Sequence, residues 1–167
     1  MRLAQALGWA LGPPGYWCTA AFLNGVNPGA RAPLPARAKR ILDRCYTAFF
    51  PSVDLDRIRL RCGARFPGVP VRPAGMALGH TIYLRQSRFD ECDCRDMLLL
   101  IHELVHVAQF VRGTWTSFAR DYAAGLLRHL SYHANPLERE ARAFTESHAM
   151  DVSQALAELC GHAAIIE

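Results

Sequence analysis

The pattern of hydrophobic and polar residues predicts one helix, two strands and then a run of helices. In residues 37–50 apolar side chains recur at helical spacing as far as Pro51, which indicates an amphipathic helix. Residues 55–60 alternate apolar and charged side chains, as a half-buried strand does. Residues 76–85 favour a second strand, interrupted at Gly79 by a bulge or a bend.

Helical periodicity and capping residues organise the second half of the chain. Asp93 can cap one helix, and Asn135, followed by a proline, is a typical start of another. Thr116 or Ser117 can cap the helix between these two. The predicted helices cover residues 95–111, 116–130, 136–150 and 152–160.

This order of elements predicts the α+β class and one domain with an N-terminal lead-in. Residues 1–35 are rich in Gly, Pro and Ala, so we expect an irregular or partly helical segment there. Residues 36–167 would form the domain, with a small, mostly antiparallel or mixed sheet packed on a central helix. A chain of 167 residues with 51% hydrophobic composition is large enough to bury such a core.

Charge and cysteine content narrow the function classes. The net charge is +4, but the basic residues are scattered, which argues against a nucleic-acid partner. Six cysteines allow three disulfides, yet a chain of this size does not need them, so we expect free thiols.

The opening MRLAQALGWALG predicts neither a signal peptide nor a membrane span. The compartment and the oligomeric state stay open, with the cytoplasm slightly favoured over a secreted or delivered effector.

The stretch LLLIHELVHVAQFVRG, residues 98–113, places three ionisable groups in an apolar helix. His102 and His106 are four residues apart, so one helix face presents both imidazoles to one metal ion. Glu103 can hold a metal-bound water and take its proton as that water attacks a carbonyl. The alternative is a chance match, but unpaired buried groups of this kind each cost on the order of several kcal/mol. A metal ion would satisfy all three.

A catalytic zinc usually needs a third protein ligand. The pattern with a glycine and a third histidine after HExxH is absent, because Gln109 and Arg112 hold those positions. The segment NPLEREARAF, residues 135–144, offers Glu138 beside its apolar stripe and Glu140 on another side. We predict Glu138 as the third ligand. The alternatives left open are three histidines: His129, His133 and His148.

GHTIYL, LLLIHELVHVAQF and NPLEREA, in this order, resemble a bacterial zincin-like family of unknown function that includes domains associated with extracellular contractile injection systems. HELVH followed by E-x-x-A also resembles the gluzincin-type metallopeptidases. The resemblance covers about residues 54–144 and implies Zn²⁺ on His102, His106 and Glu138, with Glu103 as the catalytic base. Arg142 departs from the pattern, because many relatives carry an Asp or Asn there that supports a histidine ligand. Another group must then orient the imidazoles.

These observations favour a zinc-dependent metallopeptidase that hydrolyses peptide bonds. The segment 80–84 is expected beside the active-site cleft, where an extended peptide could pair with it, although it could also simply close the sheet. The oxyanion needs a donor, for which Tyr132 ranks before Tyr122 and His133. The competing hypothesis, motivated by the short chain, is a metal-binding but non-catalytic zincin-like scaffold or interaction module.

Overall fold

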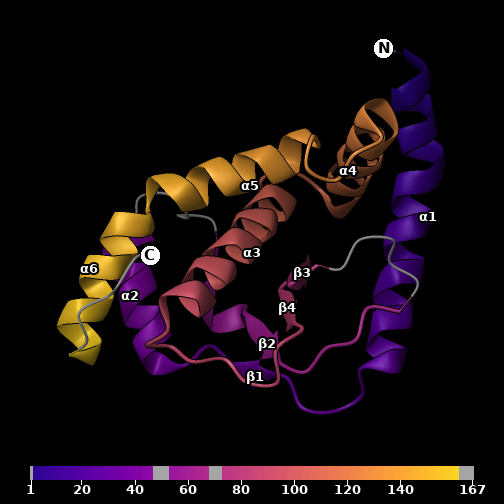
Figure 1. The fold of residues 1–167 in the computed structure, drawn as a ribbon. Coiled ribbons are helices and arrows are strands. Elements are labelled where there is room, and N and C mark those ends of the chain that lie inside the picture. The colour runs from indigo at the N-terminus through magenta and orange to yellow at the C-terminus, as the bar shows by residue number, and fades with distance from the viewer. Residues whose placement is uncertain (1, 47–52, 68–72, 162–167) are drawn as a thin grey trace.

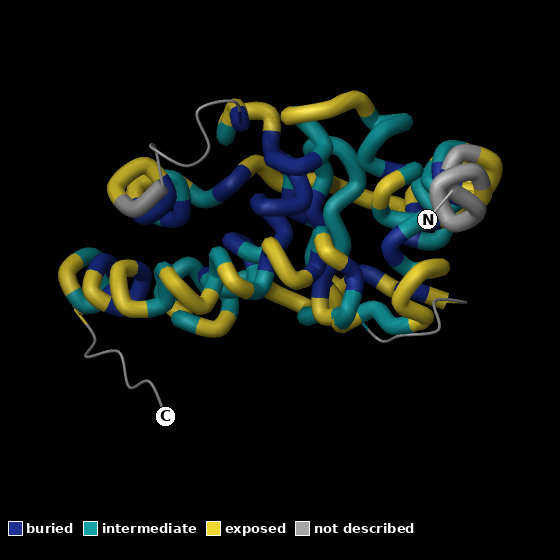
Figure 2. The backbone as a smooth tube through the Cα atoms, turned by 90° about the horizontal axis from the view of Figure 1, so that it is seen from above, coloured by how far each residue is buried: buried dark blue, intermediate teal, exposed yellow. Residues whose placement is uncertain are grey.

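The computed structural model describes residues 2–46, 53–67 and 73–161. Within these ranges the chain forms six α-helices, one 3-10 turn and a small mixed sheet, which confirms the α+β class (Figure 1). Helix α3 runs through the middle of the molecule, with α5 across one end of it. Helices α2 and α6 lie to one side of α3, and α1 and α4 lie to the other (Figure 1). Buried residues concentrate in the middle of this arrangement and exposed residues along the outer helices (Figure 2).

The helices predicted after residue 35 begin close to their predicted starts. The caps at Asp93 and Asn135 are confirmed, since each side chain accepts a hydrogen bond from a backbone N–H in the first turn of its helix. The cap of α4 is Thr114 rather than Thr116 or Ser117, because Thr114 and Ser117 form a reciprocal capping box. The helices are α1 (Arg2–Val26), α2 (Ala36–Tyr46), α3 (Cys94–Arg112), α4 (Trp115–His129), α5 (Pro136–Ser147) and α6 (Ala149–Cys160). The predicted end of α2 at Pro51 lies outside the described residues.

The sheet has the strand order β1-β2-β4-β3. Strands β2 and β4 are parallel, whereas β1 with β2 and β3 with β4 are antiparallel. The strands are β1 (Ala32–Pro33), β2 (Arg59–Arg61), β3 (Gly75–Leu78) and β4 (Thr81–Leu84). The strand predicted at 55–60 is therefore only partly right, because residues 55–57 form a 3-10 turn capped by Asp54.

The predicted strand 76–85 is in fact two strands joined at Gly79. Gly79 has φ +59°, a left-handed conformation that glycine adopts without strain, and it turns the chain back as a hairpin. The segment 80–84 thus contributes β4, an inner strand between β2 and β3, so the expectation that it borders the cleft is wrong. The edge strand next to β4 is β3.

Two apolar clusters stabilise the fold, one on each face of β4. The main core contains Ile82 and Leu84, which pack with fully buried side chains from α2, α3 and α6. Between them Tyr83 points to the opposite face and packs with Leu23 of α1 and Phe66. This alternation follows from the two-residue period of a strand.

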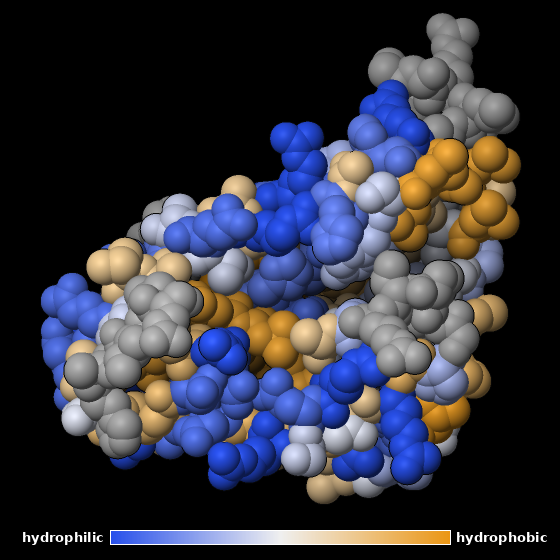
Figure 3. All heavy atoms as spheres, in the orientation of Figure 1, coloured by the Kyte–Doolittle hydropathy of each residue, from blue (hydrophilic) through white to orange (hydrophobic). Residues whose placement is uncertain are grey.

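Helix α1 occupies most of the segment predicted as an irregular or partly helical lead-in. It continues through Pro13 and Pro14 and carries exposed apolar side chains, including Leu11 and Trp17. On the face shown in Figure 3, apolar surface gathers along this helix. Across the described residues, no helix combines the length and the apolar character that crossing a bilayer requires.

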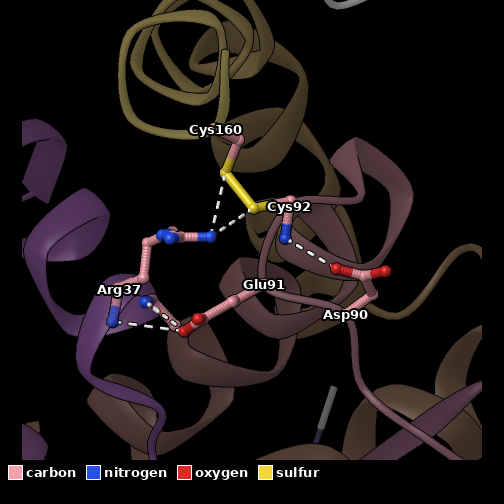
Figure 4. The surroundings of a disulfide bond; sticks show 6 residues. Arg37, Asp90, Glu91, Cys92 and Cys160 are labelled. Atoms are coloured by element: carbon pink, nitrogen blue, oxygen red, sulfur yellow. Dashed lines mark hydrogen bonds between the residues drawn. A yellow bond between two sulfur atoms is a disulfide. The ribbon is translucent and has the colours of Figure 1, made fainter. Parts of the chain in front are cut away.

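A disulfide joins Cys92 to Cys160, so the prediction of free thiols is wrong for this pair (Figure 4). The two residues are 68 positions apart in sequence, and only the packing of α6 against α3 brings their Cα atoms to 5.8 Å. Arg37 donates a hydrogen bond to Sγ of Cys92, and Glu91 accepts from the first N–H groups of α2 (Figure 4). The described cysteines that remain free are Cys18, Cys62 and Cys94.

Candidate metal centre

Helix α3 presents His102 and His106 on one face, as their four-residue spacing predicts. Their ring centroids are 5.0 Å apart, and the ring planes are nearly perpendicular. His106 is buried, whereas the side chain of His102 keeps 18% of its surface exposed. Both Nε2 atoms point away from the helix backbone toward the same carboxylate, that of Glu138.

Helix α5 places Glu138 against this pair. Asn135 starts the helix, so Glu138 lies in the first turn, and the fully buried Ala141 one turn later lets α5 approach α3 closely. Oε2 of Glu138 lies 3.4 Å from Nε2 of His102, and Oε1 lies 3.4 Å from Nε2 of His106. Only 1% of Glu138 is exposed, so two helices distant in sequence bury this contact.

The three groups could hold a metal ion, because one potential ligand atom of each lies within 4.8 Å of the others. Tetrahedral ligands at about 2.0–2.1 Å from an ion are themselves about 3.3–3.4 Å apart, close to the distances between Glu138 and the imidazoles. Among the described residues, Oε2 of Glu103 is buried with no hydrogen-bond partner, and Oε2 of Glu138 is buried with only the ionic contact to His102 at 3.4 Å. Buried carboxylate oxygens are costly when unpartnered, so a cation with its water fits this site.

The electrostatics of the cluster favour a negative Glu138. Burial alone would raise the pKa of Glu138, but the two imidazoles and the Tyr122 hydroxyl outweigh burial and hold that pKa well below its usual range. Burial would lower the pKa of His106, but Glu138 and Glu103 raise it to about 9. Without metal, His106 and Glu138 are therefore a buried ion pair, and the carboxylate is already in the form that binds a cation.

Gln109 is the group that orients His106. Its Oε1 lies 2.8 Å from Nδ1 of His106, which leaves Nε2 free to face Glu138. The amide nitrogen of Gln109 donates to the carbonyl of Leu137 and to Glu140, so the same side chain ties α3 to α5. Arg142 instead donates to the backbone carbonyl oxygen of His133 and contacts the imidazole of His133.

Glu103 points to the open edge of the sheet rather than into the main core. It is 97% buried, and the backbone N–H of Ala77 in β3 donates to its carboxylate. Gly75 makes this approach feasible, because a Cβ there would lie 2.7 Å from Oε1 of Glu103. Burial raises the pKa of Glu103, and the two imidazoles offset this only in part. A carboxylate with a raised pKa is a better proton acceptor near neutral pH.

Two tyrosines complete the surroundings of Glu138. The Tyr122 hydroxyl donates to Oε1 of Glu138 at 2.7 Å, so Tyr122 holds the carboxylate in place. Tyr132 lies in the loop before α5 and lines the cavity next to the site. Burial and the nearby Glu138 carboxylate raise the pKa of both hydroxyls, so each stays a hydrogen-bond donor.

The alternative ligands lie elsewhere. Among the described residues, the only group of three side chains suited to a metal is His102, His106 and Glu138. His133 contacts Arg142, His148 stacks on Phe144, and His129 is exposed at the end of α4.

The sequence did not predict the supporting contacts of Gln109, Gly75 and Tyr122, although Tyr122 was a candidate donor to the oxyanion. Gln109 follows His106 by three positions, a spacing that puts both on one helix face, so its role could have been inferred. Gly75 and Tyr122 carry no such local signal, because only tertiary packing brings them to the site.

A scan against protein-family models, a search of curated proteins and a search of solved structures each return no match for this chain.

Proposed function

We propose that this chain is a zinc-dependent metallopeptidase with a zincin-like fold. The observation that carries the proposal is the buried set of His102, His106 and Glu138, with the unpartnered Glu103 carboxylate oxygen beside it. Two imidazoles and one carboxylate are the ligand set of many catalytic zinc sites. The order of HELVH and NPLEREA, with its resemblance to zincin-like proteins, supports the same conclusion.

In this proposal His102, His106 and Glu138 would hold the ion through Nε2, Nε2 and a carboxylate oxygen. Bound zinc makes a coordinated water acidic and polarises a carbonyl oxygen. As a water oxygen bonds to the peptide carbonyl carbon, Glu103 would accept the water's proton at Oε2, the oxygen without a partner. It would pass this proton to the amine that leaves when the C–N bond breaks. Tyr132, whose hydroxyl contacts Glu138 at the edge of the cavity, would donate a hydrogen bond to the developing oxyanion.

The open edge of β3 supports a peptide as the substrate. An extended peptide can add to a sheet edge through backbone hydrogen bonds, and among the described residues β3 pairs only with β4. The carboxylate of Glu103 lies at this edge, on the N–H of Ala77. A peptide paired there would pass directly over the proton acceptor.

The deciding experiment is metal analysis together with an unbiased peptide-library digest of wild type and Glu103→Gln. We expect one zinc per chain in both proteins, cleavage by wild type, and a loss of at least about a thousandfold in the variant. Glu146→Gln, the same exchange on the exposed side of α5, should cleave as wild type does. If Glu103→Gln cleaves normally, the mechanism is wrong. If both proteins bind zinc and neither cleaves, the non-catalytic scaffold replaces this proposal.

A further inference from the structure

The α1–α4 cavity is a hollow of about 620 Å³ beside the candidate metal centre. The name denotes the space between α1, β3, α4 and the residues just before α5. Glu103, His106 and Glu138 belong to its lining, so the cavity and the metal centre are continuous. Its volume lies within the range of about 300–1,000 Å³ that is typical of ligand pockets.

Away from the metal centre the lining of this cavity is mostly apolar. Helix α1 contributes Leu11, β3 contributes Met76 and Leu78, and α4 contributes Phe118 and Leu126. Among the described lining residues, Glu103, His106 and Glu138 are the only ionisable side chains apart from tyrosines. A charged group against these walls would lose part of its hydration and meet no opposite charge, whereas an apolar group would be favoured.

The walls of the cavity are fixed by direct contact between α1 and α4. A Cβ added at Gly8 would lie 2.7 Å from the carbonyl oxygen of Arg120, and one at Gly12 would come still closer to Ala119. Tyr16 hydrogen-bonds the backbone of Gly79 and stacks near Phe110, which ties α1 to the β3–β4 turn and to α3. The cavity is therefore formed before a ligand binds, which limits the ordering cost of binding.

Resting on the proposed peptidase function, we propose that this cavity selects substrates with a large apolar side chain, such as Leu, Met or Phe, next to the scissile bond. All four residues of β3 line the cavity, so a peptide paired with β3 would direct a side chain into it. His102 is the one member of the metal centre outside the lining, and it is partly exposed. The other flank of the scissile bond thus meets a more open surface and contributes less selectivity.

The test is a peptide series in which one residue at a time varies on each side of the cleaved bond. We expect wild type to prefer Leu, Met or Phe over Asp or Lys at one position by roughly 10- to 200-fold in kcat/KM. Ala123→Phe fills the cavity from α4 and should remove that preference while peptides with Ala or Gly there are still cleaved. Ala21→Phe makes the same exchange on the exposed face of α1 and should leave the preference in kcat/KM unchanged. Leu126→Ala enlarges the cavity and should shift the preference toward Trp.

A binding measurement separates this inference from the peptidase proposal. Fluorescence anisotropy with labelled Phe and Ala peptides on Glu103→Gln reports binding without cleavage. We expect the Phe peptide to bind at least tenfold more tightly, and the Ala123→Phe exchange in the same background to abolish that difference. Equal binding of both peptides, or a preference that survives Ala123→Phe, would overturn the inference. Selective binding without any cleavage by wild type would overturn the peptidase proposal and leave the apolar site standing.

Discussion

Helix α3 has a buried N-terminal half and a buried C-terminal half, and the two are built from different chemistry. In the first half Met97 and Leu100 are fully buried in the main core against α2, α6 and the sheet. In the second half Leu104 and Val107 continue this core on one face. On another face Glu103 and His106 are almost equally buried, but they lie against Glu138, an apolar cavity and the edge strand β3. The disulfide between Cys92 and Cys160 ties down the first half only.

The contrast shows that burial by itself does not reveal a role. A close-packed apolar interior stabilises a fold, while orphaned carboxylate oxygens beside a cavity do not. The second half of α3 contains such destabilising buried carboxylate oxygens, and departures from good packing of this kind are typical of functional sites. Changes at the apolar core positions of the first half should therefore alter stability, and changes at the polar positions of the second half should alter metal binding and the proposed catalysis.

The largest stability effect is expected from Met97→Ala. Its side chain is fully buried, so removing it leaves a cavity and should lower the free energy of unfolding by about 2–5 kcal/mol. Met150→Ala, at 71% exposure, should stay within about 0.5 kcal/mol of wild type in the same denaturant titration. Zinc stoichiometry of the folded Met97→Ala protein should be unchanged, and a loss of zinc there would remove the distinction between the two halves.

Opening the disulfide should have the next largest effect. The bond closes a long loop, so Cys160→Ser should lower the free energy of unfolding by about 2–4 kcal/mol, measured by denaturant titration. Cys18→Ser, which replaces an exposed free thiol, is the control and should be neutral. Because the bond lies at the far end of α3 from HELVH, zinc affinity of Cys160→Ser should match wild type, and a weakened affinity would show that the two halves are coupled.

Replacing Gln109 tests the second half without touching a ligand. Gln109→Leu removes the acceptor for Nδ1 of His106 and should weaken zinc binding about 10- to 100-fold in a chelator competition. Gln109→Glu keeps the acceptor and should restore part of the affinity. Gln154→Leu makes the same exchange at an exposed site on α6. Equal affinities for wild type and Gln109→Leu would show that His106 is oriented without Gln109.

The smallest effect concerns pH. In the metal-free protein the neighbouring carboxylates raise the pKa of His106 to about 9, so below that pH its imidazole carries a proton that a metal ion must displace. Zinc affinity should strengthen by up to about tenfold per pH unit as the pH rises toward 9, and then level off. Calorimetry in buffers of different ionisation enthalpy measures the released proton. No proton release at pH 7.5 would mean that His106 is already neutral.

Local sequence rules were sufficient for most of the helices after residue 35 and for the polar face of α3, but not for the 25-residue helix α1. Helical spacing and caps depend on residues within four positions of each other, so Asp93, Asn135 and the HELVH face could be read directly. The same rule put Glu138 on the buried side of α5, and the structure brings it to His102 and His106. The Arg142 departure also led correctly to the need for another orienting group, although Gln109 itself was not identified.

Tertiary structure decided everything that depends on contacts between distant segments. Whether β4 or β3 forms the sheet edge depends on pairing with β2, which no local pattern encodes. The disulfide depends on α6 packing beside the start of α3, and the cavity depends on α1 meeting α4 through its glycines. The sequence by itself therefore determined which residues could bind a metal. The packing determined what lies next to them, because side chains far apart along the chain meet only when the core forms.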